Sequence, residues 1–189
     1  MCVYIAVDIG GTQTRVASFS GNSLQPVKLD RIATKSSHPL LERLIALIGK
    51  LWPEDDAVEA IGVAAPGPLD PHTGILHDAP NIPEWNNFPL RQHIETAFSV
   101  PVAVGNDANM AALAEWQYGA GKGHEHLVYL TISTGIGGGV ISHGCLLQGF
   151  HGMGAELGHM ILVPDGPPCG CGGRGHVESF CSGPSIARY

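Results

Sequence analysis

Two glycine-rich segments have the composition of backbone turns that bind phosphate. The first is DIGGTQT, at residues 8–14, where paired glycines follow an apolar stretch. Glycine lets the backbone approach phosphate oxygens closely, threonine hydroxyls donate hydrogen bonds, and a carboxylate can orient hydrated magnesium. We assign these roles to Asp8, Gly10, Gly11, Thr12 and Thr14. The alternative is an ordinary Gly-Gly hairpin turn.

The second segment is STGIGGG, at residues 133–139, and it also follows an apolar stretch. The same chemistry and the same alternative apply to it, with Thr134, Gly135, Gly137 and Gly138 as the candidate phosphate contacts. Two such turns, each after a predicted buried strand, are harder to explain as plain hairpins than one. Together they favour a phosphate-binding role for both.

A candidate general base lies in GNDAN, at residues 105–109. Asp107 is predicted to stand between a buried strand and a helix, where the helix dipole keeps its carboxylate ionised. From there it can accept a hydroxyl proton as a phosphoryl group is transferred. The alternative is an Asp or Asn cap for the helix, and the motif taken alone favours that alternative.

A Cys-x-Cys pair with a histidine on each side predicts a metal site. The four residues are His159, Cys169, Cys171 and His176. They supply enough ligands for a closed tetrahedral zinc site, which would hold an otherwise coil-rich segment in place. The spacing is not that of a common zinc finger, so the alternative is a pair of reduced cysteines in a glycine loop. A structural zinc fits best.

The elements that must position these residues follow from the apolar periodicity. Strands are predicted over residues 3–8, 15–19, 60–64, 100–104 and 127–133, and helices over residues 39–52 and 109–118. The strand, glycine turn, strand unit of the N-terminus recurs at 127–142, with residues 134–139 as the turn and 140–142 as the return strand. This repeat indicates two similar lobes facing each other across a cleft. The second is incomplete, because only a short helical pattern follows Cys169.

The composition indicates a globular protein and excludes some partners. With 189 residues, 44% of them hydrophobic, the chain can bury a substantial core. Its formal net charge of −7 offers no basic surface for nucleic acid or an anionic membrane. No apolar run reaches the roughly 18 residues of a membrane-spanning helix, and no secretory signal is recognisable. Five cysteines without such a signal do not indicate a disulfide framework, so we expect a cytoplasmic protein.

A series of motifs in order resembles the bacterial ROK family, named for repressors, open reading frames and kinases. They are AVDIGGTQTR, GVAAPGPLD, APNIPEW, GNDANMAALAEW, STGIGGG, GAELGHM and CGCGGRGHVESFCSG. The resemblance covers nearly the whole chain and implies an α/β, actin-like ATPase (ribonuclease H-like) fold. It implies a complete first lobe over residues 1–117 and a partial second lobe, with the zinc-binding loop, over residues 118–189.

The resemblance also implies an activity, the ATP-dependent phosphorylation of a hexose by a glucokinase-like enzyme that uses magnesium. Asp107 would be the catalytic base, and the two glycine turns would hold the phosphates of ATP in the cleft between the lobes. The sugar site would be lined by Gly67, Asn81, Asn106, Asp107, Glu156, His159 and Glu178. Such polar side chains suit a polyol, whose hydroxyls need paired donors and acceptors. His159 would serve both zinc and sugar.

Two departures from the family pattern matter. The family usually has a third cysteine where this chain has His176, so the zinc ligands would be His159, Cys169, Cys171 and His176, with Cys181 as the alternative to His176. The family also continues beyond the segment that ends at Tyr189, which implies a truncated piece or a cleft built with another chain. An incomplete lobe would expose apolar surface, so we expect a homo-oligomer, namely a dimer.

Several alternatives remain open at this point. The motifs do not distinguish glucose, mannose, fructose and N-acetylmannosamine as the substrate, because kinases for all four share them. The donor could be polyphosphate in place of ATP, although no basic patch suits a polyanion. Two other functions compete with the kinase, a non-catalytic sugar-binding lobe and a sugar-responsive transcriptional regulator. Regulators of the family carry a helix-turn-helix domain before the first phosphate strand.

Overall fold

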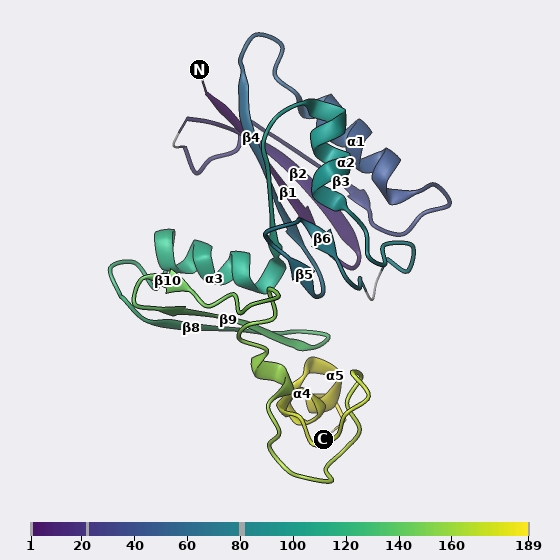
Figure 1. Cartoon of the computed structure of the whole chain (residues 1–189), viewed down its shortest axis with the longest axis vertical. Coiled ribbons are helices and arrows are strands. Elements are labelled where there is room, and N and C mark those ends of the chain that lie inside the picture. The colour runs from purple at the N-terminus through teal and green to yellow at the C-terminus, as the bar shows by residue number, and fades with distance from the viewer. Residues whose placement is uncertain (1, 22, 80–81, 189) are drawn as a thin grey trace. The chain divides into compact units, whose positions relative to one another are not determined.

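The chain is divided into two compact units, Met1–Asp107 and Ala108–Tyr189. The computed structural model describes residues 2–21, 23–79 and 82–188. Figure 1 shows the helices and strands of each unit. Among the described residues, no helix is both long and apolar enough to cross a membrane.

The first unit is built on a five-stranded mixed sheet with the order β3-β2-β1-β4-β7. The strands are β1 (Val3–Ile9), β2 (Gln13–Ser20), β3 (Lys28–Ala33), β4 (Val58–Ala65) and β7 (Val102–Asn106). β2 pairs antiparallel with both β1 and β3, whereas β4 is parallel to both β1 and β7. The carboxyl ends of β1, β4 and β7 therefore meet at one edge of the sheet.

Two helices cover one face of this sheet, α1 (Leu40–Leu51) and α2 (Leu90–Phe98). Burial alternates along β1, so that every second residue of the strand enters the core. The buried face of α1 has the spacing of an amphipathic helix, and α2 adds Leu90 and Ile94. A small hairpin of β5 (Leu69–Asp70) and β6 (Ile75–Leu76) completes the unit.

The second unit contains a three-stranded antiparallel sheet with the order β10-β9-β8. Its strands are β8 (Leu127–Ile132), β9 (Ile136–Ser142) and β10 (Cys145–Leu146). The helix α3 (Asp107–Tyr118) packs on β9, and the chain continues through the short helices η1 (Leu157–His159), α4 (Val177–Cys181) and α5 (Gly183–Ile186). Within the described part of the chain, β8 pairs with β9 alone, so its other edge is open.

The expected turn over residues 134–139 is wrong in its extent. The turn ends at Gly135, and Gly137, Gly138 and Gly139 are strand residues of β9, paired with β8. These glycines are required by packing, because a Cβ on Gly139 would lie 2.5 Å from the Ala112 Cβ of α3. The glycines that resemble a long loop therefore bring a helix close to the sheet.

Candidate functional site

The first glycine turn joins β1 to β2 and is closed by its own backbone. The Gly10 N–H donates to the Gln13 carbonyl over 3.0 Å. A Cβ on Gly10 would lie 2.9 Å from the same oxygen, so the turn requires glycine there. The Asp8 carboxylate, at the end of β1, is half-exposed and lies 3.2 Å from the Arg15 guanidinium. A surface ion pair of this kind leaves carboxylate oxygens open to a ligand.

Thr34, just after β3, supports this turn from inside the unit. Its hydroxyl donates to the Gly10 carbonyl over 2.6 Å, and its N–H donates to the Thr12 carbonyl over 2.9 Å. The Thr14 hydroxyl lies 3.1 Å from the Thr34 hydroxyl, and Thr14 is fully buried. The Thr14 hydroxyl therefore serves the turn itself. Thr34 leaves no signal in the sequence, because a threonine at a strand end carries no motif.

The remaining candidates of the first unit gather at the carboxyl edge of the parallel strands. Asn106 ends β7 and donates from Nδ2 to the Gly67 carbonyl over 3.3 Å. Gly67 follows β4 and has a φ of +84°, a conformation that favours glycine. Asp107 begins α3 directly after β7 and is exposed. Asn81, the other expected sugar contact here, lies outside the described residues.

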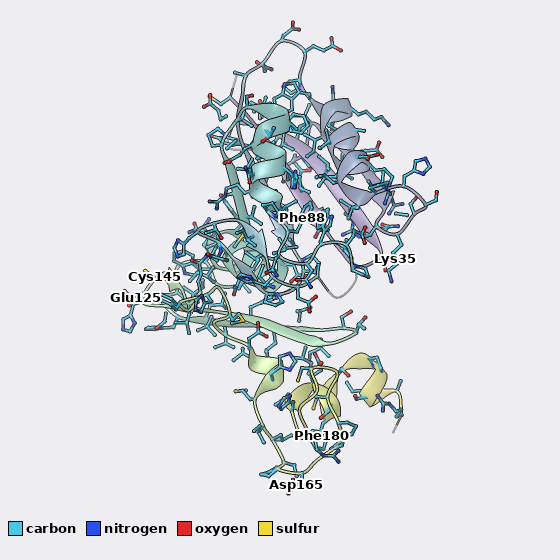
Figure 2. The ribbon with its side chains drawn as sticks, turned by 45° about the vertical axis from the view of Figure 1, so that its right-hand side comes forward. Lys35, Phe88, Glu125, Cys145, Asp165 and Phe180 are labelled. Carbon is cyan, nitrogen blue, oxygen red and sulfur yellow. The ribbon has the colours of Figure 1, made fainter. Side chains whose placement is uncertain are left out.

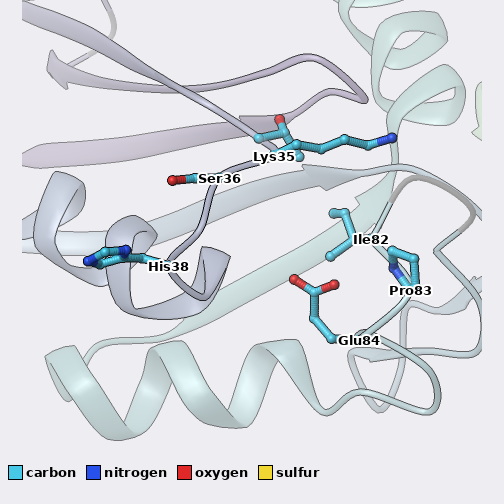
Figure 3. Close-up of a pocket in the computed structure, with 7 residues that line it drawn as sticks. Lys35, Ser36, His38, Ile82, Pro83 and Glu84 are labelled. Carbon is cyan, nitrogen blue, oxygen red and sulfur yellow. The ribbon is translucent and has the colours of Figure 1, made fainter.

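A pocket of about 280 Å³ adjoins the support of the first glycine turn (Figure 3). It lies between two loops of the first unit, one with Thr34, Lys35, Ser36 and His38, and the other with Ile82, Pro83 and Glu84. Because Thr34 belongs to both features, the pocket is connected directly to the glycine turn. Its lining combines polar and apolar groups and includes one side chain of each charge, Lys35 and Glu84.

The second glycine turn, Ser133–Gly135, is held by the segment that follows the cysteine loop. The Ile136 N–H donates to Oε2 of Glu178 over 2.8 Å, and the Gly183 N–H donates to the Ser133 carbonyl over 2.8 Å. Thr134 is exposed, whereas Gly138 is buried in β9. Sequence reasoning missed the amide contacts of Ile136 and Gly183, because backbone groups leave no signal in residue type.

His159, Cys169, Cys171 and His176 lie together, with their ligand atoms all within 4.8 Å of one another. Nδ1 of His159 is 3.8 Å from the Cys169 Sγ, and Nδ1 of His176 is 3.3 Å from the Cys171 Sγ. Bonds of about 2.3 Å to sulfur and about 2.0 Å to nitrogen place the ligand atoms of tetrahedral zinc about 3.3–3.8 Å apart. The donor set suits zinc, and these two pairs already have the required spacing. Among the described residues, the group contains His176 and not Cys181.

The environment of Cys169 favours its protonated form when no metal is bound. Burial raises the pKa of the Cys169 thiol, and the neighbouring Cys171 thiol and Glu178 carboxylate raise it further, although a backbone hydrogen bond at Cys171 opposes this. The thiol donates to Oε1 of Glu178 over 3.6 Å. A metal ion that takes this sulfur as a thiolate must therefore displace a proton.

The expected sugar contacts of the second unit surround these ligands. The two ring nitrogens of His159 face different neighbours, since Nδ1 is near Cys169 and Nε2 is 3.9 Å from Oε2 of Glu156. Such a division lets one nitrogen bind a metal while the other faces a carboxylate or a ligand. Glu178 contacts both Cys169 and the second glycine turn. Glu156, His159 and Glu178 are thus brought together in this unit.

Comparison with known proteins gives one consistent family. The chain is 40% identical over 187 residues to a glucokinase of Thermotoga maritima, covering 98% of this chain and 59% of the relative. A ROK hexokinase structure from Thermus thermophilus matches with a TM-score of 0.86 at 40% identity, covering 98% of this chain and 62% of that one. A ROK family glucokinase from Streptomyces griseus, in complex with glucose and AMPPNP, matches with a TM-score of 0.83 at 37% identity, covering 99% and 59%.

The chain therefore spans about three fifths of the length of the relatives that it matches. The structural similarity confirms the expected actin-like ATPase α/β fold with a mixed sheet. The model of the ROK family matches residues 4–189, which includes both glycine turns and the metal-ligand group. On this match and these identities, the chain belongs to the ROK family.

Proposed function

We propose that this chain is part of an ATP-dependent hexose kinase that converts a sugar and ATP to the sugar 6-phosphate and ADP. The observation that carries the proposal is the position of Asp107, an exposed carboxylate at the start of α3. It directly follows β7, at the edge of the sheet where β1 ends in its glycine turn. The similarity to glucokinases, including one with glucose and AMPPNP bound, supports the same assignment.

In the proposed reaction, Asp107 accepts the proton of the sugar hydroxyl while the hydroxyl oxygen attacks the γ-phosphorus of ATP. The bond between that phosphorus and the β,γ-bridging oxygen breaks, and ADP leaves with the electron pair. The N-terminus of α3 favours the ionised form of Asp107, as a base requires. Phosphoryl transfer depends mainly on positioning and charge stabilisation, so the turns that hold phosphate are the other essential part.

The roles of the two turns are assigned by their chemistry. Gly10, Gly11 and Thr12 would donate to phosphate oxygens with Thr14 supporting the turn, and the turn at Thr134 and Gly135 would do the same, with Gly137 and Gly138 in the strand behind it. Magnesium, when bound near Asp8, would neutralise charge on the phosphate oxygens. The remaining polar candidates would bind sugar hydroxyls, namely Gly67, Asn81, Asn106, Glu156, His159 and Glu178.

The experiment is a measurement of ADP release with ATP, magnesium and a panel of glucose, mannose, fructose and N-acetylmannosamine. Asp107→Asn keeps the shape of the side chain and removes the base, so it should lower turnover by about 10²–10⁴-fold while sugar binding is retained. Asp55→Asn, at an exposed loop position, is the matched control and should behave as the wild type does. Full activity in Asp107→Asn would refute the mechanism, and activity with polyphosphate alone would change the donor.

A second candidate function is sugar binding without phosphoryl transfer. It is favoured by the open edge of β8. In the first unit, β1 pairs with β2 on one side and in parallel with β4 on the other, whereas β8 pairs only with β9 among the described residues. Absence of turnover together with sugar binding in calorimetry would support this candidate for the 189-residue chain. Loss of both would contradict it.

A further inference from the structure

The helix α4 and the first residue of α5 contact the second glycine turn, one on each side. Before the turn, the Ser133 carbonyl accepts from the N–H of Gly183, the first residue of α5, over 2.8 Å. After the turn, the Ile136 N–H donates to Oε2 of Glu178 over 2.8 Å, in the first turn of the helix. One short segment, residues 178–183, thus fixes the backbone at both ends of the turn.

The approach is close at both glycines. A Cβ on Gly183 would lie 2.9 Å from the Ser133 carbonyl oxygen, and a Cβ on Gly135 would require the end of the flexible Glu178 side chain to shift. The two glycines, one in the turn and one after the helix, therefore permit these contacts. At Gly183 two backbone segments approach each other closely, and the absence of a side chain allows it.

The same helix is attached to the candidate metal ligands. His176 precedes its first residue, and the carbonyl of His176 accepts from the Ser179 hydroxyl over 2.6 Å. The thiol of Cys169 donates to Oε1 of Glu178 over 3.6 Å. The two oxygens of one carboxylate therefore face different parts, a metal ligand on one side and the glycine turn on the other.

Further contacts hold the loop between η1 and α4, residues 160–176, against α4. The Val177 N–H donates over 3.0 Å to the carbonyl of Met160, the residue that follows His159 of η1. On the other side, Phe180 of α4 lies beside Gly166, where a Cβ would be 3.0 Å from the Phe180 ring. Figure 2 shows Phe180 within the same compact region as Asp165, the neighbour of Gly166. These contacts join the loop to the helix.

We propose that metal binding orders the second glycine turn through α4, with Glu178 as the positioning residue. A tetrahedral ion would fix Cys169 and His176 together, and so fix the start of α4 and the Glu178 carboxylate. Glu178 and the Gly183 amide then hold Ser133 to Ile136 in one conformation. This inference rests on the proposed zinc site. That the ordered turn then binds phosphate rests on the proposed function. The test measures only the order of the turn and requires neither ATP nor sugar.

The test is amide hydrogen exchange of the full chain, measured by mass spectrometry with one equivalent of zinc and after removal of zinc by a chelator. In the wild type, zinc removal should speed exchange in the segment 133–137 by about tenfold, because a backbone hydrogen bond loses its fixed acceptor. The flanking β8 and β9 segments, residues 127–132 and 138–142, should change little. Equal acceleration in all three segments, or none in 133–137, would overturn the proposal.

Substitutions separate Glu178 from the metal itself. Glu178→Ala should exchange rapidly at 133–137 with zinc present and show no further change on its removal, while still binding one equivalent of zinc. Glu178→Gln keeps an oxygen that accepts from Ile136, so its exchange should stay close to that of the wild type. Glu156→Gln is the matched control, because Glu156 lies 3.9 Å from Nε2 of His159 and its substitution removes a charge beside a candidate metal ligand rather than at the turn. If exchange at 133–137 in Glu178→Ala stayed slow with zinc and became faster without it, zinc would order the turn without Glu178.

Discussion

The Thr14 hydroxyl lies 3.1 Å from the Thr34 hydroxyl, and both side chains are buried. Thr34 uses its proton to donate to the Gly10 carbonyl, so Thr14 is the donor in the threonine pair. The chain of hydrogen bonds thus runs from β2 through the end of β3 to the first glycine turn. The conformation of that turn depends on a residue that lies outside its motif.

Replacing Thr34 should therefore destabilise the first unit. Thr34→Val removes the hydroxyl and leaves the Gly10 carbonyl and the Thr14 hydroxyl without this partner in a buried place, at a cost of about 1–3 kcal/mol in the free energy of unfolding. Thr34→Ser retains the hydroxyl and should lose less. Urea denaturation of the three proteins compares them directly, and equal stabilities would mean that the pair contributes nothing.

The glycines of β9 provide a prediction about packing. Gly139→Ala would bring a Cβ to 2.5 Å from the Ala112 Cβ and should destabilise the second unit by about 1–3 kcal/mol. Gly62, in β4, has no atom within 4 Å of its ideal Cβ. Gly62→Ala is thus the matched control and should change stability by less than about 0.5 kcal/mol. Thermal denaturation measures both, and a stable Gly139→Ala protein would contradict the packing argument.

Substitution of His176 tests the proposed metal ligands. The wild type should bind one equivalent of zinc, and His176→Ala should weaken binding by more than about tenfold because a ligand is lost. His176→Cys supplies a thiolate in its place and should bind at least as tightly as the wild type. Cys181→Ala is the control for the alternative ligand and should leave affinity unchanged. Competition with a chromophoric chelator measures all four, and unchanged affinity in His176→Ala would remove it from the ligand set.

The raised pKa of Cys169 gives stability a pH dependence that reverses with metal. Without zinc, the folded state holds this proton more tightly than the unfolded state, so the stabilisation is present below the ordinary thiol pKa of about 8.5 and is lost as pH rises beyond it. With zinc, the proton competes with the metal for the sulfur. Lowering the pH should therefore weaken zinc affinity, by about tenfold per pH unit for each thiol proton displaced, and with it the stability of the zinc-bound protein. Denaturation curves at several pH values, with and without zinc, should therefore slope in opposite directions.

The open edge of β8 predicts self-association of this chain. Val128, Leu130 and Ile132 are exposed along the strand, and LVYLTI contains no charged residue to block edge pairing. Leu130→Lys should shift the chain toward monomer in light scattering. Tyr118→Lys, a similar change at an exposed residue at the end of α3, is the control and should not. A wild type that is monomeric at high concentration would contradict the prediction.

The part of the fold that could be predicted from the sequence is the part with strong apolar patterns. The β-branched runs of β1, β4 and β8 and the leucine spacing of α1 are found close to their predicted positions. The edge strand β3 was not predicted, because KLDRIA is mostly exposed and carries no apolar alternation. The helix α2 was also missed, since only Leu90 and Ile94 are buried along it.

The candidate site, like the fold, could be predicted only in part. The residue types cysteine and histidine predict a metal group, and the structure brings His159, Cys169, Cys171 and His176 together. The contact between Glu178 and the Ile136 amide could not be predicted, because an amide is present at every residue other than proline. The start of β9 was misjudged for a related reason, since glycine is common both in turns and where a helix packs closely on a strand.

The order of elements along the chain has a consequence for synthesis. Every strand of the five-stranded sheet, and both helices that cover it, lie between Val3 and Asn106. Translation adds about 5–20 residues per second and domains fold as units, so the first sheet can be complete while β8 is still inside the ribosome. On a polysome, the uncharged strand β8 therefore emerges only after every strand of the five-stranded sheet is available to fold.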